Sequence, residues 1–126
     1  MEGNINPKQL LINVLTDAGY VEGKTLFLHN SMPEDMPYPD TFVTFKNEKS
    51  IDDLFRENEP YQTIWYFFVS VYSNDPELTN TELLRLRPLL KAKGFYPKGK
   101  GEDIASDEPT HTGRVLDVIY TEINEI

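Results

Sequence analysis

The chain has 126 residues, of which 39% are hydrophobic and 26% are charged, and this length and composition predict one soluble globular domain spanning residues 1–126. Its 21 Asp and Glu residues against 12 Lys and Arg give a net charge of -9, which disfavours a protein that binds nucleic acid through a basic surface. The absence of cysteine excludes disulfides, thiolate nucleophiles and cysteine-ligated zinc, and we expect neither a signal peptide nor a membrane span.

The first predicted element is a helix that begins after Asn6 and ends at Gly19. Asn6 can cap the helix, Pro7 suits the first helical position, and glycine readily adopts the backbone conformation that ends a helix. Apolar residues recur between them at helical spacing, so one face of this helix is predicted to be buried. A short strand over residues 25–28 follows.

Three prolines in the segment HNSMPEDMPYPD, residues 29–40, predict a loop, because proline cannot donate a backbone hydrogen bond. Such a loop is either a plain connector or a stiff arm that contacts another subunit. The sequence TFVTFKN, residues 41–47, is typical of a strand. The polar residues 50–60 predict an excursion with at most one helical turn.

The segment QTIWYFFVSVYS, residues 62–73, predicts a long strand with two apolar faces. Tyr66 and Phe68 lie on one face, and Phe67 and Val69 lie on the other. A strand with water on one side normally alternates apolar and polar residues, so both faces of this strand require cover. The cover comes either from a neighbouring subunit, which we favour, or from the chain's own helices or a folded-over sheet.

A second helix is predicted with Thr79 as its N-cap, Glu82 completing a capping box, and Gly94 as its stop. Pro88 lies inside this helix and cannot donate to the preceding turn. A kink or a local break is therefore predicted there.

A glycine- and charge-rich passage, with an optional short strand near residues 103–105, leads to a final strand over residues 115–123. The order of elements is then α-β-β-β-α-β. That order predicts an α+β domain in which two helices pack on one face of a mostly antiparallel sheet. The other face of the sheet, which is rich in aromatic residues, is left to be covered.

Basic residues gather in one short segment, whereas the rest of the chain is acidic. A solvated helix face is the simplest interpretation of such a charge run. The residues are Arg85, Arg87, Lys91, Lys93, Lys98 and Lys100.

The segment SDEPTHTGR, residues 106–114, brings together residue types that catalyse reactions or bind metal ions. A nucleophilic serine would need His111 and Asp107 to converge within one loop, and no metal-binding motif is present. The same residues suit a turn that enters a strand, with Arg114 pairing with Asp107 or Glu108 to clamp the loop. We therefore predict no catalytic residue, no metal site and no cofactor. The alternative is a monomeric enzyme, or a binder of a metal ion or small molecule, that uses this loop.

Three stretches resemble the small tail-completion proteins of tailed bacteriophages, prophages and phage-tail-like bacteriocins. They read TLFLHNSMPEDMPYPDTFVTF, YQTIWYFFVSVYSNDPELTNTELLRLRPLLKAKGF and ASDEPTHTGRVLDVIY, and they cover nearly all of the chain after the first helix. The resemblance implies a tail-terminator-like fold and a structural subunit that is not an enzyme. It further implies a ring, generally a hexamer, that caps the head-proximal end of the tail tube, ends tube polymerisation and joins the tail to the head.

The same resemblance implies partners and a location. The partners would be copies of the chain itself and the tail tube protein, with a sheath or a head connector as further candidates. DNA would only pass through the ring, and no membrane would be involved. The protein would be in the cytoplasm of the bacterial host during assembly and in the virion tail or bacteriocin particle afterwards. Candidate residues for assembly contacts or for the loop clamp are Tyr38, Asp40, Asp107, Glu108, His111 and Arg114.

Overall fold

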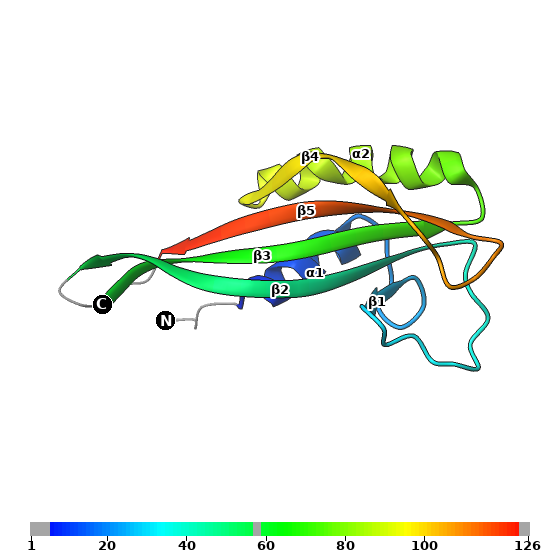
Figure 1. The fold of residues 1–126 in the computed structure, drawn as a ribbon, viewed down its shortest axis with the longest axis horizontal. Helices are drawn as coiled ribbons and strands as arrows, with labels where there is room; N and C mark the ends of the chain where they lie inside the picture. The colour runs from blue at the N-terminus through cyan, green and yellow to red at the C-terminus, as the bar shows by residue number, and fades with distance from the viewer. Residues whose placement is uncertain (1–5, 57–58, 124–126) are drawn as a thin grey trace.

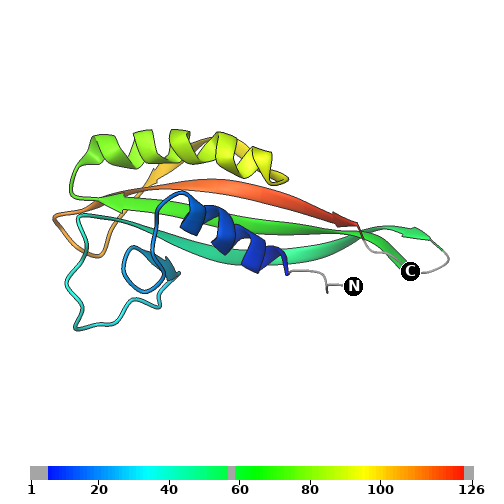
Figure 2. The same cartoon turned by 180° about the vertical axis from the view of Figure 1, so that it is seen from behind.

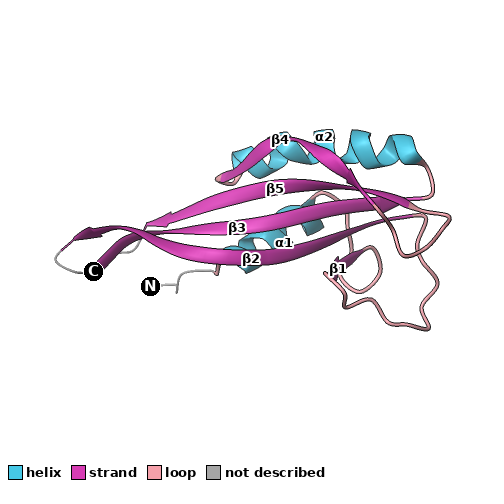
Figure 3. Ribbon diagram, in the orientation of Figure 1, coloured by secondary structure: helices cyan, strands magenta, loops and turns pink. Residues whose placement is uncertain are grey.

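The computed structural model, which describes residues 6–56 and 59–123, contains two helices and five strands (Figures 1 and 3). In chain order they are α1 (Pro7–Asp17), β1 (Leu26–Leu28), β2 (Thr41–Arg56), β3 (Glu59–Ser73), α2 (Pro76–Ala92), β4 (Phe95–Ile104) and β5 (Thr112–Ile123). This order, α-β-β-β-α-β-β, confirms the predicted α+β class and adds one full strand to it.

The strands form one sheet in the order β1-β2-β3-β5-β4. β1 runs parallel to β2, and the other neighbouring pairs are antiparallel, as predicted for a mostly antiparallel sheet. β3 lies at the centre, between β2 and β5, and β1 and β4 form the two edges (Figure 1).

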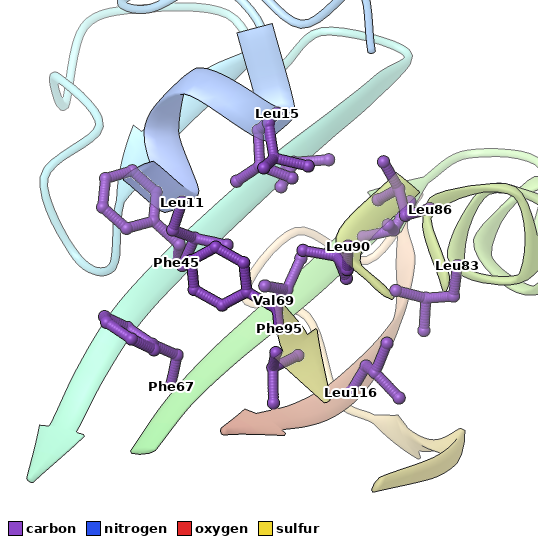
Figure 4. Packing of buried hydrophobic residues seen from close by; sticks show 14 of the residues in the cluster. Leu11, Leu15, Phe45, Phe67, Val69, Leu83, Leu86, Leu90, Phe95 and Leu116 are labelled. Carbon is purple, nitrogen blue, oxygen red and sulfur yellow. The ribbon is translucent and has the colours of Figure 1, made fainter. Parts of the chain in front are cut away.

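Both helices pack on one face of the sheet, which we call the helix face (Figure 2). Leucines of the two helices meet alternate residues of the long strands there (Figure 4). Burying each such side chain contributes about 1.5–3 kcal/mol, so this layer is the main source of stability. The helix residues are Leu11, Leu15, Leu83, Leu86 and Leu90, and the strand residues include Val43, Phe45, Phe67, Val69 and Leu116.

The first helix starts and stops as the sequence predicts. Asn6 is the N-cap, and its Oδ1 accepts the N–H of Lys8 at 2.8 Å. Pro7 takes the first helical position. Gly19, with a φ of 111°, lies just beyond the end of the helix.

The second helix begins one turn earlier than predicted. Its N-cap is Asp75, whose carboxylate accepts a backbone N–H of the first turn at 3.1 Å, and Pro76 follows. The prediction that Thr79 caps the helix was wrong, since its hydroxyl donates to the carbonyl of Pro76 at 2.7 Å from inside the helix. Asp75 and Pro76 repeat the cap and proline signature of the first helix. The helix continues through Pro88 without a break, and Gly94, with a φ of 89°, follows its end.

Residues 50–56 and 59–60 belong to strands, so the predicted polar excursion with a helical turn was wrong; residues 57–58 lie outside the described residues. β2 continues to Arg56, and β3 begins at Glu59. Polar side chains bond across the pair, with the hydroxyl of Thr63 donating to the carboxylate of Asp52 at 2.9 Å. Pairing with β3 therefore overrides the weak β-propensity of this polar segment.

β4 covers residues 95–104, where the sequence predicted an irregular passage with an optional short strand. A bulge between Lys98 and Glu102 interrupts its pairing with β5. Gly99 and Gly101 lie in this bulge with φ values of 85° and 98°, which glycine adopts readily. The glycines thus bend a strand instead of ending it.

A polar contact joins the segment after α1 to α2. The hydroxyl of Tyr20 donates to Glu82 Oε1, which also accepts from the Arg85 guanidinium at 2.8 Å. Chiefly because of the Arg85 hydrogen bond, the pKa of Glu82 lies below its ordinary value. Burial, and then the carboxylate of Glu82, raises the pKa of Tyr20 far above its ordinary range.

Candidate functional site

The face of the sheet opposite the helices, which we call the open face, carries exposed apolar side chains. This face is turned toward the viewer in Figure 1, with α1 behind the sheet. Ile51 lies opposite Ile64 on the neighbouring strand, and Tyr96 lies opposite Ile119. The exposed fraction is 60% for Tyr96, 53% for Ile123 and 44% for Ile51. Water-facing sheet surfaces are normally polar, so these side chains suit a contact with another protein.

The central strand β3 shows the difference between the two faces. Phe67 and Val69 on the helix face are buried under the chain's own helices, whereas Tyr66 and Phe68 on the open face are half-buried. The sequence predicted that both faces of this strand need cover. The chain's own helices supply that cover on the helix face. The open face is covered at one end only.

Two loops, residues 29–40 and residues 105–111, cover that end of the open face, and we call them the two-loop rim. Phe42 on β2 is buried there. The Tyr38 ring from the first loop lies edge-on to it at 5.4 Å between ring centroids, and the His111 ring from the second lies at 6.0 Å. The predicted stiff loop thus packs on the sheet.

His111 ties the two loops of the rim together. Its Nε2 lies 2.7 Å from the carbonyl oxygen of Pro39, and its Nδ1 lies 2.9 Å from the hydroxyl of Thr110. Because a carbonyl oxygen only accepts, Nε2 carries a proton and donates. With its other nitrogen bonded to Thr110 and 8% of the residue exposed, His111 acts here as a structural link.

Tyr38 and Asp40 hold the first loop against the ends of β2 and β3. The ring of Tyr38 lies edge-on to that of His111, at 5.5 Å. Asp40 Oδ1 accepts from the side-chain amide of Asn74 at 3.0 Å, and the Asp40 carbonyl accepts the N–H of Asn74 at 2.9 Å. Both residues therefore contribute to the shape of the rim.

Asp107 and Glu108 form the turn of the second loop. The hydroxyl of Ser106 accepts the N–H of Glu108 at 3.1 Å, and the carbonyl of Glu108 accepts the N–H of His111 at 3.0 Å. The side chain of Asp107 is exposed and lies near Tyr72. Burial is the main reason that the pKa of Tyr72 is raised, and the charge of Asp107 raises it further.

Arg114 clamps the bulge of β4. Its guanidinium donates to Asp103 Oδ1 at 2.7 Å and to the carbonyl oxygens of Lys100 and Gly101 at 3.1 Å and 2.8 Å. Three bonds from one planar group fix the backbone where the strand pairing is interrupted. The clamp thus acts within the sheet.

The predicted pairing of Arg114 with Asp107 or Glu108 was wrong. Side chains alternate along β5, and Arg114 lies opposite Val71, which belongs to the helix face. Asp107 lies on the other side of the sheet, beside Tyr72. The two charges are therefore separated by the sheet itself.

Two hollows adjoin each other on the open face beside the rim. The first has a volume of about 360 Å³ and is lined by residues that include Tyr38, Tyr72 and Asp107. The second, of about 270 Å³, extends over the strands toward Phe68. They share His29, Thr44 and Tyr72 among their lining residues, so together they form one groove.

The exposed residues Ile51 and Tyr96 were missed from the sequence because they fall in segments that were assigned to irregular structure. A signal for Tyr96 was available. It follows Phe95, and two successive aromatic residues have high β-propensity and point to opposite faces of a strand. Ile51 lies among polar residues, which hid the alternation.

Within residues 6–56 and 59–123, no three His, Asp or Glu side chains gather closely enough to hold a metal ion. In the same part of the chain, no helix combines the length and the apolar character that crossing a membrane requires. A scan of protein-family models gave no match to this chain, and a search of curated proteins gave no significant match.

Proposed function

We propose that this chain is a structural subunit of the tail-completion type. Copies of it form a ring, generally a hexamer, that caps the head-proximal end of a tail tube, ends tube polymerisation and provides the surface that joins the tail to the head. The proposal rests on the resemblance of three stretches of the sequence to that family, and the surface of the fold supports it.

The observation that carries the proposal is the exposed apolar surface of the open face. Tyr96, Ile123 and Ile51 are each exposed by more than two-fifths, although the helix face already supplies a complete core. Exposed apolar side chains on one surface of a small protein are typical of an interface. A subunit that works by joining other proteins needs such a surface, whereas a monomeric binder of a small molecule does not.

Features at both sheet edges discourage contact through added strands. β2 extends far beyond the short edge strand β1, and it carries a bulge between Asn47 and Lys49 with charged residues on either side. β4 carries the bulge between Lys98 and Glu102. Bulges and charges protect edges from pairing with another chain. Contacts through the open face and the rim are therefore favoured.

The proposed partners are other copies of this chain and the tail tube protein, with a sheath or head connector next to the ring. The net charge of -9 suits a ring through which DNA passes, because an acidic wall repels phosphates and lets the DNA slide. Assembly would take place in the cytoplasm of the bacterial host, and the finished particle would carry the ring.

Electron microscopy of tail tubes assembled with this chain tests the proposal. The wild-type protein is expected as a ring at one end of tubes of uniform length. The double variant Tyr96→Thr/Ile51→Thr keeps β-propensity and removes the exposed apolar groups, so it should leave tubes uncapped and of uneven length. Val21→Thr/Leu84→Gln, which alters exposed apolar residues elsewhere, is the control. A wild-type chain that stays monomeric beside assembled tubes would contradict the proposal.

A further inference from the structure

Charge is divided between two regions of the molecule. The six basic residues from Arg85 to Lys100 have no acidic residue among them, which leaves six basic residues for the rest of the chain against all 21 acidic ones. Arg85 is paired with Glu82 and Arg87 is half-buried. The remaining four are exposed, and we call them the basic strip: Lys91, Lys93, Lys98 and Lys100.

The two-loop rim has the opposite charge. Neither residues 29–40 nor residues 105–111 include a lysine or arginine. Among the ion pairs of the described residues, none involves the rim or the basic strip. Asp40 accepts from Asn74, and Lys98 lies opposite Asp117 on β5, so the other charges are the ones most available to a partner. The acidic residues of the rim are Glu34, Asp35, Asp40, Asp107 and Glu108.

The first loop of the rim and the basic strip lie toward opposite edges of the sheet. Residues 29–40 follow β1, which is one edge, and the basic strip lies at the end of α2 and on β4, which is the other edge (Figure 1). His111 holds the second loop of the rim to the first through Pro39. Two complementary surfaces on opposite sides of one subunit fit a head-to-tail contact, which closes into a ring when the rotation between copies allows it.

We infer that the acidic rim of one copy binds the basic strip of the next copy. This inference rests on the proposed function, to which it adds the surfaces and the direction of the subunit contact. The occupant is a second copy of this chain because the chain itself carries both complementary charges. The hollow beside the rim fits a lysine side chain: the rings of Tyr38 and Tyr72 line it, and the carboxylate of Asp107 lies beside them.

Charge reversal on each surface tests the contact. Lys91→Glu/Lys98→Glu/Lys100→Glu turns the basic strip acidic, so both surfaces are acidic, and Glu34→Lys/Asp35→Lys/Asp107→Lys turns the rim basic, so both surfaces are basic. Each variant alone should associate with itself at least tenfold more weakly than the wild type in analytical ultracentrifugation, because like charges meet. Mixing the two variants should restore assembly, since every contact in an alternating oligomer then joins opposite charges. Lys8→Glu and Asp17→Lys change charge on α1, which belongs to neither surface, and should leave association unchanged.

Salt gives a second readout from the same samples. Raising salt from about 0.1 M to about 1 M shortens the Debye length from about 10 Å to about 3 Å, so wild-type association should weaken while association of the reversed variants should recover in part. Three results would overturn the inference: a wild-type chain that is monomeric at every concentration, association that the reversals do not change, or reversed variants that do not recover when mixed.

Cross-linking determines the direction of the contact without relying on charge, because the natural chain has no cysteine. A chain with Asp35→Cys and Lys100→Cys should form a ladder of covalent multimers under mild oxidation, since each contact joins one cysteine of each kind. Covalent dimers from either single variant alone, with no ladder from the double variant, would show a symmetric contact and overturn the inference. Charge-dependent rings that fail to cap tubes would refute the proposed function and leave this contact standing.

Discussion

The imidazole of His111 donates a hydrogen bond from Nε2 to the carbonyl oxygen of Pro39, at 2.7 Å, across 72 residues of chain. This bond joins the two loops of the rim, and the ring of Tyr38 packs against the same imidazole at 5.5 Å. Two loops that are polar and rich in proline therefore behave as one surface. The residue that looked most like a catalytic base in the sequence is the residue that holds this surface together.

Replacing His111 with alanine should separate the two loops. The Pro39 carbonyl loses its partner, and the cost is about 1–3 kcal/mol in the free energy of unfolding, measured by urea denaturation. Amide hydrogen exchange should become faster within residues 29–40. His29→Ala, which removes the other and exposed histidine, is the control and should change neither quantity by a comparable amount. Unchanged exchange in residues 29–40 of the His111→Ala protein would show that the bond does not hold the loops.

Removing the guanidinium of Arg114 should loosen the bulge of β4 and leave the rim in place. Arg114→Ala deletes three hydrogen bonds and leaves the carbonyls of Lys100 and Gly101 without this partner, at a cost of about 1–3 kcal/mol. Hydrogen exchange should rise around residues 99–103. Lys100→Ala keeps the carbonyl and serves as the control. Faster exchange in residues 105–111 instead would support the clamp expected from the sequence.

Acid should weaken the link between Tyr20 and α2. The pKa of Glu82 is lowered from its ordinary value of 4.5 in the folded protein, mainly by Arg85. Its ionised form therefore stabilises the fold above about pH 4.5, and this contribution is lost as the pH falls through the folded pKa. Glu82→Gln should cost about 1 kcal/mol at neutral pH and reduce the loss of stability on acidification. The control is the exposed Glu102→Gln, and an unchanged pH profile for Glu82→Gln would contradict the assignment.

The two glycines of the β4 bulge should respond differently to alanine. Gly99 has a φ of 85° and open space around its Cα, so Gly99→Ala carries only the backbone strain of about 1–2 kcal/mol. At Gly101, with a φ of 98°, a Cβ would lie 2.9 Å from Leu83 and 3.1 Å from the carbonyl of Val115. Overpacking adds about 1–3 kcal/mol to the strain. Thermal unfolding of the two variants checks that Gly101→Ala loses more stability than Gly99→Ala. Equal losses of stability would show that α2 shifts to make room for the Cβ.

The sequence predicted those elements whose signals are local. Asn6 with Pro7 at the start of α1 and the long apolar run of β3 needed no knowledge of the rest of the chain. The polar end of β2 and the glycine-rich β4 were mispredicted because their strand character comes from pairing, with β3 in one case and with β5 in the other. Propensity alone cannot reveal such pairing.

The candidate site was predicted as a set of residues but not as a set of contacts. Tyr38 and His111 do meet in the rim, beside Asp40 in the first loop, which spacing in the sequence could not establish. Arg114 was paired with acidic residues of the preceding loop, whereas alternation along β5 places it on the other side of the sheet. The face of the sheet on which the Arg114 side chain lies decides its partner. That face depends on the residue at which β5 begins.

The bond between His111 and Pro39 also bears on how fast copies of the chain would associate. A rim that is already held in shape has no loop to fold on contact, so docking should proceed at the rates of rigid partners, about 10⁵–10⁷ M⁻¹s⁻¹ before electrostatic attraction is added. Opposite charges on the two surfaces raise the frequency of encounter, while short-range packing on the open face sets how long a contact lasts. A change in salt should therefore alter the association rate constant much more than the dissociation rate constant.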